Sequence, residues 1–332
     1  MRNPIVTAVV ASCALMIAGV SAFVGVAVSG AWAQGYPLRM ITMVVPFPAG
    51  GGVDAMARIT AGHLSRALGQ QVIIDNRGGA AGVIGTRAAV KAAPDGYTLV
   101  MSTSGTTSIN PILYANPGYD PLKDFIPIGF MASTPIAVMA HPSFPAKTLG
   151  EMIVLAKRSG RLEAGTPPPG TENYLAAELF KSMIGADMTI VTYKGTGPLT
   201  NDLLGNHIAV AFNTLGPALG NIQSGLLRVL AVAAPKRSGL LPDVPTAEES
   251  GLPGFEAAVR YGLLAPAGTP RPVVDRINKE LQAMAVSDAE RALIAAQGGE
   301  PLATSSEEFA ADIARDQAKW GPLIHKLGLR VD

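Results

Sequence analysis

The chain has little charge, a single cysteine and few histidines. Charged residues make up 15% of its 332 residues, against roughly 25% in soluble domains. The 26 basic and 25 acidic residues give a formal net charge of +1, so the positive footprint of a nucleic-acid binder is missing. One cysteine and four histidines are too few for a disulfide framework or a cysteine-rich zinc site. We therefore expect neither a nucleic-acid partner nor a bound metal.

Long apolar runs are also scarce. A single run in the sequence reaches membrane-spanning length, and it lies at the N-terminus. Arg2 is the only charge before Arg39, and an apolar stretch over residues 5–28 precedes an Ala-Trp-Ala site at residues 31–33. A basic start, an apolar run and a small-residue site predict a cleavable secretory signal peptide, residues 1–33. An uncleaved anchor helix is the competing interpretation. Cleavage would remove Cys13 and exclude a cysteine nucleophile from the exported protein.

Strand and helix patterns alternate along the remaining chain. Short β-branched apolar runs predict buried strands, and 3- to 4-residue periodicities predict helices between them. The expected strands are residues 40–45, 72–74, 97–101, 136–140, 188–193, 208–212, 227–233 and 259–265. The expected helices are residues 53–68, 81–93, 171–184, 198–204, 216–224, 272–285 and 289–296, one that opens at 148, and a last one from 305 that Pro322 should kink or break. This alternation predicts an α/β fold of doubly wound sheets flanked by helices.

The pattern falls into two units of comparable size with no flexible linker between them. Such an arrangement is typical of hinged binding proteins whose two lobes share more than one crossover and enclose a cleft. We expect lobe 1 to comprise residues 34–133 plus 256–332, and lobe 2 to comprise residues 134–255.

The loop at residues 46–54 is the strongest candidate for a binding site. It joins a strand to a helix N-terminus, and its glycines allow backbone N–H groups to approach a ligand closely. Phe47, Ala49, Gly50 and Gly51 are the candidate contacts, since such a helix N-terminus favours an anion such as a carboxylate. Asp54 either caps the helix or accepts a ligand donor. The loop lacks the G-x-G-x-x-G pattern, so we expect no dinucleotide and no other cofactor.

Two further loops offer polar contacts. The hydroxyl-rich segment 102–108 follows a strand and contributes Ser102, Ser104 and Thr106, although a simple helix cap and turn is the alternative interpretation. The loop at residues 165–171 precedes a helix of the second unit and contributes Thr166 and Thr171. Two helix N-termini facing each other across a cleft would hold both ends of a diacid.

Six short stretches, in a fixed order, resemble a known family. They are residues 44–54 (Val-Val-Pro-Phe, then Gly-Gly-Gly-Val-Asp), 75–82 (Asp-Asn-Arg-Gly-Gly-Ala-Ala-Gly), 94–99 (Pro-Asp-Gly-Tyr-Thr-Leu), 193–195 (Tyr-Lys-Gly), 241–246 (Leu-Pro-Asp-Val-Pro-Thr) and 264–270 (Leu-Ala-Pro-Ala-Gly-Thr-Pro). With them, residues 36–330 resemble the Bug-type solute receptors of tripartite tricarboxylate transporters.

The resemblance implies a monomeric two-lobed periplasmic binding protein of the Venus-flytrap type. Such a protein closes on a small carboxylate, docks on integral-membrane permease subunits and is not an enzyme. In similar proteins the ligand is bound largely through backbone groups and water, from loops that correspond here to residues 47–54, 102–106 and 166–171. The strand end with Asn213 and Thr214 completes the implied site.

Three consecutive prolines and Asn213 depart from the family pattern. Residues 167–169 are proline where relatives have small residues, so this loop lacks the N–H donors that would bind an anion. Asn213 stands where an aspartate is common. Its neutral side chain predicts a carboxylate or neutral polar ligand rather than one with a free ammonium group.

Two other functions compete with transport. A ligand-sensing periplasmic adaptor for a sensor kinase would use the same fold and cleft. An α/β hydrolase would need a base paired with a serine of residues 102–108, and no histidine has such a motif context. The sequence leaves the identity of the carboxylate open.

Overall fold

The computed structural model describes residues 35–159 and 162–332. The predicted signal peptide, residues 1–33, and Cys13 lie outside the described residues. Among the helices in the described part of the chain, none combines the length and apolarity needed to cross a membrane.

One lobe, here called lobe 1, is built on a parallel sheet. Its strands β1 (Ile41–Val45), β2 (Val72–Asn76) and β3 (Thr98–Thr103) pair in the order β2-β1-β3, and β9 (Ala258–Pro266) adds to β3 in the antiparallel sense. Helix α2 (Gly52–Leu68) connects β1 to β2, and α3 (Val83–Ala89) connects β2 to β3. Strands and crossover helices alternate as the sequence pattern predicts.

Lobe 2 repeats this design. Strands β5 (Leu162–Thr166), β6 (Met188–Thr192) and β7 (Val210–Thr214) are parallel, with α6 (Glu172–Ile184) and α7 (Thr196–Leu204) as their connections. Helix α5 (Leu149–Ser159) precedes them, and α8 (Leu219–Gln223) and β8 (Arg228–Val232) follow.

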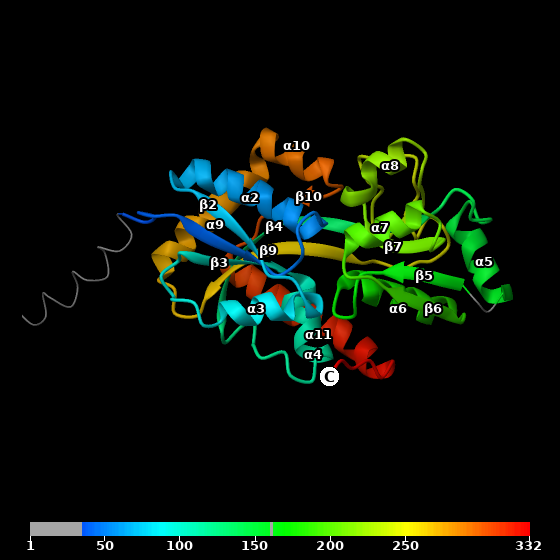
Figure 1. Cartoon of the computed structure of the whole chain (residues 1–332), viewed down its shortest axis with the longest axis horizontal. Helices are drawn as coiled ribbons and strands as arrows, with labels where there is room; N and C mark the ends of the chain where they lie inside the picture. The colour runs from blue at the N-terminus through cyan, green and yellow to red at the C-terminus, as the bar shows by residue number, and fades with distance from the viewer. Residues whose placement is uncertain (1–34, 160–161) are drawn as a thin grey trace, which may run out of the picture.

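A single long strand, β4 (Phe125–Ala140), passes through both lobes. Its residues 125–135 pair with β9 in lobe 1, and its residues 136–140 pair with β7 and β8 in lobe 2. The sequence predicted a strand only over 136–140. The predicted lobe boundary at residues 133/134 lies within β4, just before this change of partner. Figure 1 shows the two lobes side by side with β4 and β9 running between them.

The C-terminal helices α9 (Arg271–Val286), α10 (Asp288–Ala296) and α11 (Ser306–Lys326) return to lobe 1, with the short strand β10 (Glu300–Pro301) between the last two. Helix α11 packs against β4 and against residues 105–109, which form a π-helical turn before α4 (Asn110–Leu113). The sequence predicted a kink or a break at Pro322, and the break was wrong, because α11 continues to Lys326. Trp320 and Ile324 are buried on either side of the proline, and their packing holds the final turn in place.

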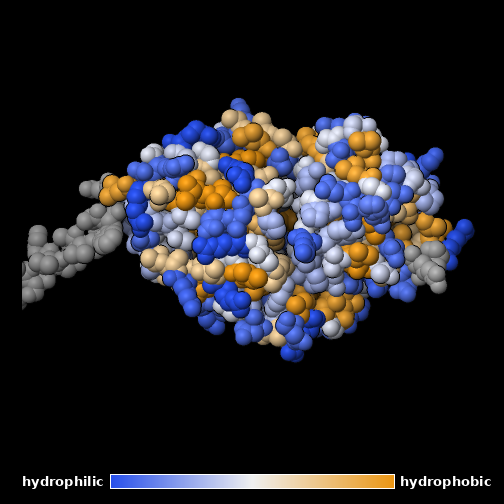
Figure 2. Space-filling model, viewed as in Figure 1, coloured by the Kyte–Doolittle hydropathy of each residue, from blue (hydrophilic) through white to orange (hydrophobic). Residues whose placement is uncertain are grey.

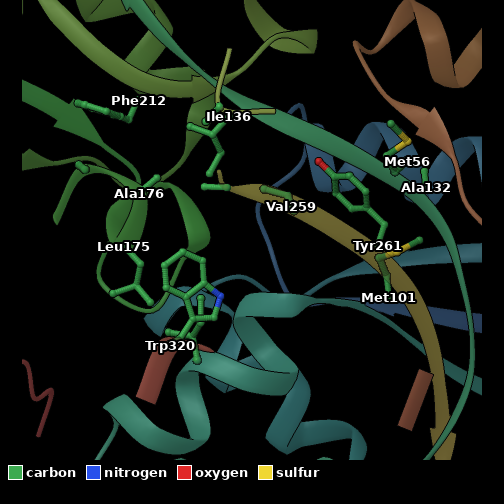
Figure 3. Packing of buried hydrophobic residues seen from close by; sticks show 14 of the residues in the cluster. Met56, Met101, Ala132, Ile136, Leu175, Ala176, Phe212, Val259, Tyr261 and Trp320 are labelled. Atoms are coloured by element: carbon green, nitrogen blue, oxygen red, sulfur yellow. The ribbon is translucent and has the colours of Figure 1, made fainter. Parts of the chain in front are cut away.

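The main hydrophobic core is continuous between the lobes. Figure 3 shows Ile136 of β4 and Val259 of β9 lying between lobe 1 side chains such as Met101 and lobe 2 side chains such as Phe212. The region that joins the lobes is therefore a packed two-strand connection rather than a loose linker.

Candidate functional site

A cavity of about 1070 Å³ lies between the two lobes. Lobe 1 contributes the loops that follow β1 and β2, and lobe 2 contributes the loops that follow β5 and β6. The carboxyl ends of parallel strands are where ligands bind in open α/β sheets. Figure 2 shows the surface hollowed between the lobes in the same view.

The N-terminus of α2 forms one wall of the cavity. Its N-cap residue is Gly51, and no side chain caps the helix. The N–H groups in the first turn of any α-helix lack an intrahelical partner, and here no N-cap side chain accepts from them either. They carry the positive end of a helix of 17 residues. Gly50 turns the chain into the helix with φ of 82°, a left-handed conformation that favours glycine.

A second helix N-terminus lies beside the first in the cavity wall. Helix α7 begins after Gly195 and also lacks a side-chain cap. A Cβ placed on Gly51 would lie 3.2 Å from Thr196 Oγ1, so the two helix starts nearly touch. The exposed side chain of Lys194 precedes this cap and lines the same cavity. Positive electrostatic potential from both lobes converges here.

Two buried hydroxyl groups lie beside the start of α2. A Cβ on Gly52 would lie 3.4 Å from Thr214 Oγ1 and 3.6 Å from the Tyr261 hydroxyl. Thr214 is 3% exposed, and its Oγ1 has no hydrogen-bond partner among the described residues. Burial raises the pKa of Tyr261, so its hydroxyl stays protonated and able to donate. An unpartnered hydroxyl beside free N–H groups is the arrangement that an anion would complete.

Asp54 is close to this anion-favouring region but is neutralised by its own neighbours. Its carboxylate accepts hydrogen bonds from Gly50 N (3.0 Å), Arg58 Nε (2.9 Å) and Asn76 Nδ2 (3.0 Å). Burial raises the pKa of Asp54, but the Arg58, Gly50 and Asn76 donors outweigh it, and the net pKa is lowered. The carboxylate of Asp54 therefore stabilises the conformation of the loop at residues 46–54 through these hydrogen bonds.

Six of the predicted site residues line the cavity: Phe47, Ala49, Gly50, Gly51, Thr171 and Thr214. Thr171 Oγ1 caps α6 by accepting from Tyr174 N, and it donates to Pro168 O. Pro167 and Pro168 line the cavity without N–H groups to offer. This side of the site is therefore a rigid wall rather than a donor loop.

The other predicted residues do not line this cavity and are bonded elsewhere. Ser102 Oγ donates to Gly262 O, Thr106 Oγ1 to Thr103 O, and Thr166 Oγ1 to Pro167 O. Ser104 Oγ donates to the carboxylate of Glu172. All four hydroxyls are buried, so each serves the architecture around the cavity.

Asn213 likewise points away from the cavity. Its amide donates to Thr200 Oγ1 at 3.1 Å, and its Oδ1 accepts from Thr214 N. The ligand preference predicted from Asn213 therefore loses its structural basis.

Gly52, Glu172, Thr196 and Tyr261 line the cavity and were not singled out from the sequence. Thr196 follows the Tyr-Lys-Gly stretch at 193–195, which was noted for its resemblance alone. Tyr261 had no local signal, because it reaches the site from β9, more than 200 residues after Gly52.

A second cavity of about 950 Å³ lies beside β4 and β9. Its lining carries both signs of charge, with Arg260, Arg291 and Lys319 beside Asp288 and Asp316. Arg260 is already paired with two carboxylates of α11, those of Asp312 and Asp316. Among the described residues that line the first cavity, Lys194 is the basic side chain, and it lies beside the two uncapped helix starts.

The model of the tripartite tricarboxylate transporter family receptor matches residues 56–329. The chain belongs to this receptor family. It is 35% identical to BugT of Bordetella pertussis over 301 residues, which cover 90% of this chain and 92% of that protein.

Solved structures of relatives have the same fold. The periplasmic binding protein BugD is 35% identical, with a TM-score of 0.83, covering 89% of this chain and 99% of BugD. Rpa4515 of R. palustris, solved with adipate, is 33% identical, with a TM-score of 0.85 and the same shares of the two chains. The fold is therefore that of a periplasmic binding protein.

Proposed function

We propose that this receptor is exported to the periplasm, binds a small organic carboxylate between its lobes, and delivers it to a tripartite tricarboxylate-type membrane permease. It does so without a cofactor and without catalysis. Membership in the receptor family supports the solute-binding part, and the relative solved with adipate supports an acid of that size. The predicted signal peptide, residues 1–33, supplies the route of export.

One observation carries the ligand class. The uncapped starts of α2 and α7 meet at Gly51 and Thr196, with the unpartnered Thr214 hydroxyl beside them. A carboxylate at this point accepts from first-turn N–H groups and from the hydroxyls of Thr196, Thr214 and Tyr261. Such charge-assisted hydrogen bonds are roughly twice as strong as neutral ones.

The ligand also joins the two lobes. Its carboxylate contacts α2 and Tyr261 of lobe 1 together with α7 and Thr214 of lobe 2, so binding favours the closed form. The lobes then move about β4 and β9, with residues 34–133 plus 256–332 as one body and 134–255 as the other. The permease recognises the closed receptor.

A thermal-shift screen of the purified protein against small mono-, di- and tricarboxylates and their amides tests the ligand class. A ligand at about 100 times its dissociation constant adds about 2.7 kcal/mol of stability, or several degrees for a chain of this size. We expect a shift with acids and none with the matching amides. Equal shifts with acids and amides, or a shift with neutral solutes only, would remove the carboxylate from the proposal.

Deletion of the receptor in its own host tests the partner. We expect uptake of the acid that binds to be lost while expression of its transport genes still responds to that acid. Intact uptake with lost gene induction would instead identify a sensing adaptor.

A further inference from the structure

The second cavity lies on the opposite face of β4 and β9 from the proposed carboxylate site. Along β9, Val259 and Tyr261 line the first cavity. The residues that alternate with them, Ala258 and Arg260, line the second. Successive side chains of a strand point to opposite faces of its sheet. Ser133 of β4 is paired opposite Arg260 and lines the second cavity with it. The strands that join the lobes thus separate the two cavities.

Each lobe supplies one wall of the second cavity. The lobe 1 wall is one side of α10 together with part of α11. Three residues of α10 on that side, Asp288, Ala292 and Ala295, recur at the spacing of helical turns. The lobe 2 wall is the segment at residues 233–240, which follows β8. The second cavity therefore spans the boundary between the lobes, as the first cavity does.

Each wall is fixed to its own lobe. In lobe 1, the ion pair of Arg260 with Asp316 joins α11 to β9. In lobe 2, Arg237 donates to Glu249 Oε2 at 2.8 Å and to Pro242 O at 3.0 Å, which ties the segment 233–240 to the chain that follows it. The walls therefore move with their lobes, and the width of the second cavity follows the angle between the lobes.

The lobes nearly touch on one side of the strands while the second cavity is open on the other. A Cβ on Gly51 would lie 3.2 Å from Thr196 Oγ1 on the side of the first cavity, and the second cavity has about 950 Å³. Strands β4 and β9 connect the lobes (Figure 1), so the lobes separate by bending these strands. A bend that widens the space over one face of a strand pair narrows the space over the other. Opening the first cavity therefore brings the walls of the second cavity together.

We propose, given the carboxylate binding by lobe closure described above, that the second cavity controls the affinity of the receptor for its ligand. The closed form requires a wide second cavity, and the open form requires a narrow one. Small residues on facing walls, Ala292 of lobe 1 and Gly239 of lobe 2, leave room for the open form. A bulky side chain at either position disfavours the open form. The apparent affinity then rises, because more of the free protein is already closed when the ligand arrives.

The variant Ala292→Trp tests the proposal from the lobe 1 wall. Ala292 is exposed at the edge of the cavity, so an indole there displaces no core side chain. Calorimetric titration with hexanoate, adipate and citrate measures the affinity for a mono-, a di- and a tricarboxylate. We expect about 3- to 10-fold tighter binding, since a complete shift from about 10% closed gives about tenfold. The factor should be the same for every acid that binds, because closure and not a ligand contact has changed.

The variant Gly239→Trp repeats the test from the lobe 2 wall. A Cβ on Gly239 would meet nothing within 4 Å, and its backbone is outside the left-handed region, so the substitution causes no strain. Ala289→Trp is the control, because Ala289 is exposed on the same helix as Ala292 but outside the cavity lining. We expect unchanged affinity in this control. Thermal unfolding checks that each variant is folded, and because the two test variants enter from opposite walls, either one alone decides.

Small-angle X-ray scattering of the ligand-free proteins separates this inference from the proposed function. We expect a smaller radius of gyration in Ala292→Trp and Gly239→Trp than in the unchanged protein and in Ala289→Trp. Contraction of the test variants without binding of any acid would support the coupling of the second cavity to closure and contradict the carboxylate function. Binding of an acid by the unchanged protein, with neither contraction nor a gain of affinity in a folded test variant, would overturn this inference alone. A loss of affinity in a folded test variant would overturn it as well.

Discussion

Gly52 contributes to the site through the side chain that it lacks. The space above its Cα is bounded by the hydroxyls of Thr214 and Tyr261 at ordinary van der Waals distance. A methyl group would therefore fit without displacing the protein, but it would occupy the place where a carboxylate oxygen receives its hydrogen bonds. The residue is at the first position of α2, in a conformation open to other amino acids.

The variant Gly52→Ala should weaken carboxylate binding about 10- to 100-fold, because hydrogen bonds to charged groups contribute about 1.5–3 kcal/mol. Its melting temperature should not fall. Calorimetry and thermal unfolding measure the two effects separately. Gly62→Ala, in the interior of the same helix and away from the cavity, should raise stability by up to about 1 kcal/mol with no change in affinity. Full affinity in Gly52→Ala would place the carboxylate elsewhere.

Residue chemistry predicted the anion-favouring loop but misjudged several individual contacts. Glycines at a strand-to-helix junction are visible in the sequence, and six predicted residues line the cavity. The hydroxyl of Ser102 instead donates a hydrogen bond to Gly262, and the amide of Asn213 donates one to Thr200. Such partners are distant in sequence, so a single chain read in order does not reveal which polar groups remain free.

At the scale of elements, one buried carboxylate fastens α10 to α2. Glu290 Oε1 accepts from Arg66 at 2.5 Å and lies 3.2 Å from His63 Nδ1, both on α2, while Ser287 bonds Oε2. The hydrogen bond from Ser287, with those from His63 and Arg66, outweighs burial and lowers the pKa of Glu290 to about 2.

The variant Glu290→Gln should therefore lose stability in a pH-dependent manner. A depressed pKa means that the ionised form stabilises the fold above the ordinary value of 4.5, and that this contribution disappears as the pH falls toward 2. We expect a loss of about 2 kcal/mol at pH 7 that stays level down to about pH 4.5 and shrinks between pH 4.5 and 2, measured by urea unfolding. The variant Glu248→Gln, at an exposed position, makes the same charge change and is the control. A loss that does not vary with pH would show that packing, not charge, holds α10.

Elements with clear periodicity were predictable, and irregular ones were not. Helix α2 has apolar residues at helical spacing, and strands β1 to β3 are short apolar runs. All four elements lie close to the predicted ranges. The first part of β4 contains Pro127, Gly129 and Pro135, residues that weigh against a strand. It is nevertheless paired along β9, with register shifts beside Pro127 and Phe130. Tertiary pairing overrides the local preference there.

For the whole molecule, the order of elements predicted two α/β units, whereas the connection between them needed the structure. The absence of a flexible linker indicated more than one shared crossover, and β4 and β9 are the two strands that run between the lobes. The uncapped start of α2 lies beside that of α7, whereas the start of α6, which also lines the cavity, is capped by Thr171. This arrangement depends on how β4 and β9 set the two lobes. No local pattern contains that relation.

A crystal structure of the receptor with the acid that stabilises it most tests the central claim directly. The account predicts that the ligand carboxylate lies within hydrogen-bond distance of the first-turn N–H groups of α2 and of the hydroxyls of Thr196 and Thr214. A carboxylate bound in the second cavity beside Arg260 and Arg291, or one in the first cavity without contact to either helix start, would contradict it.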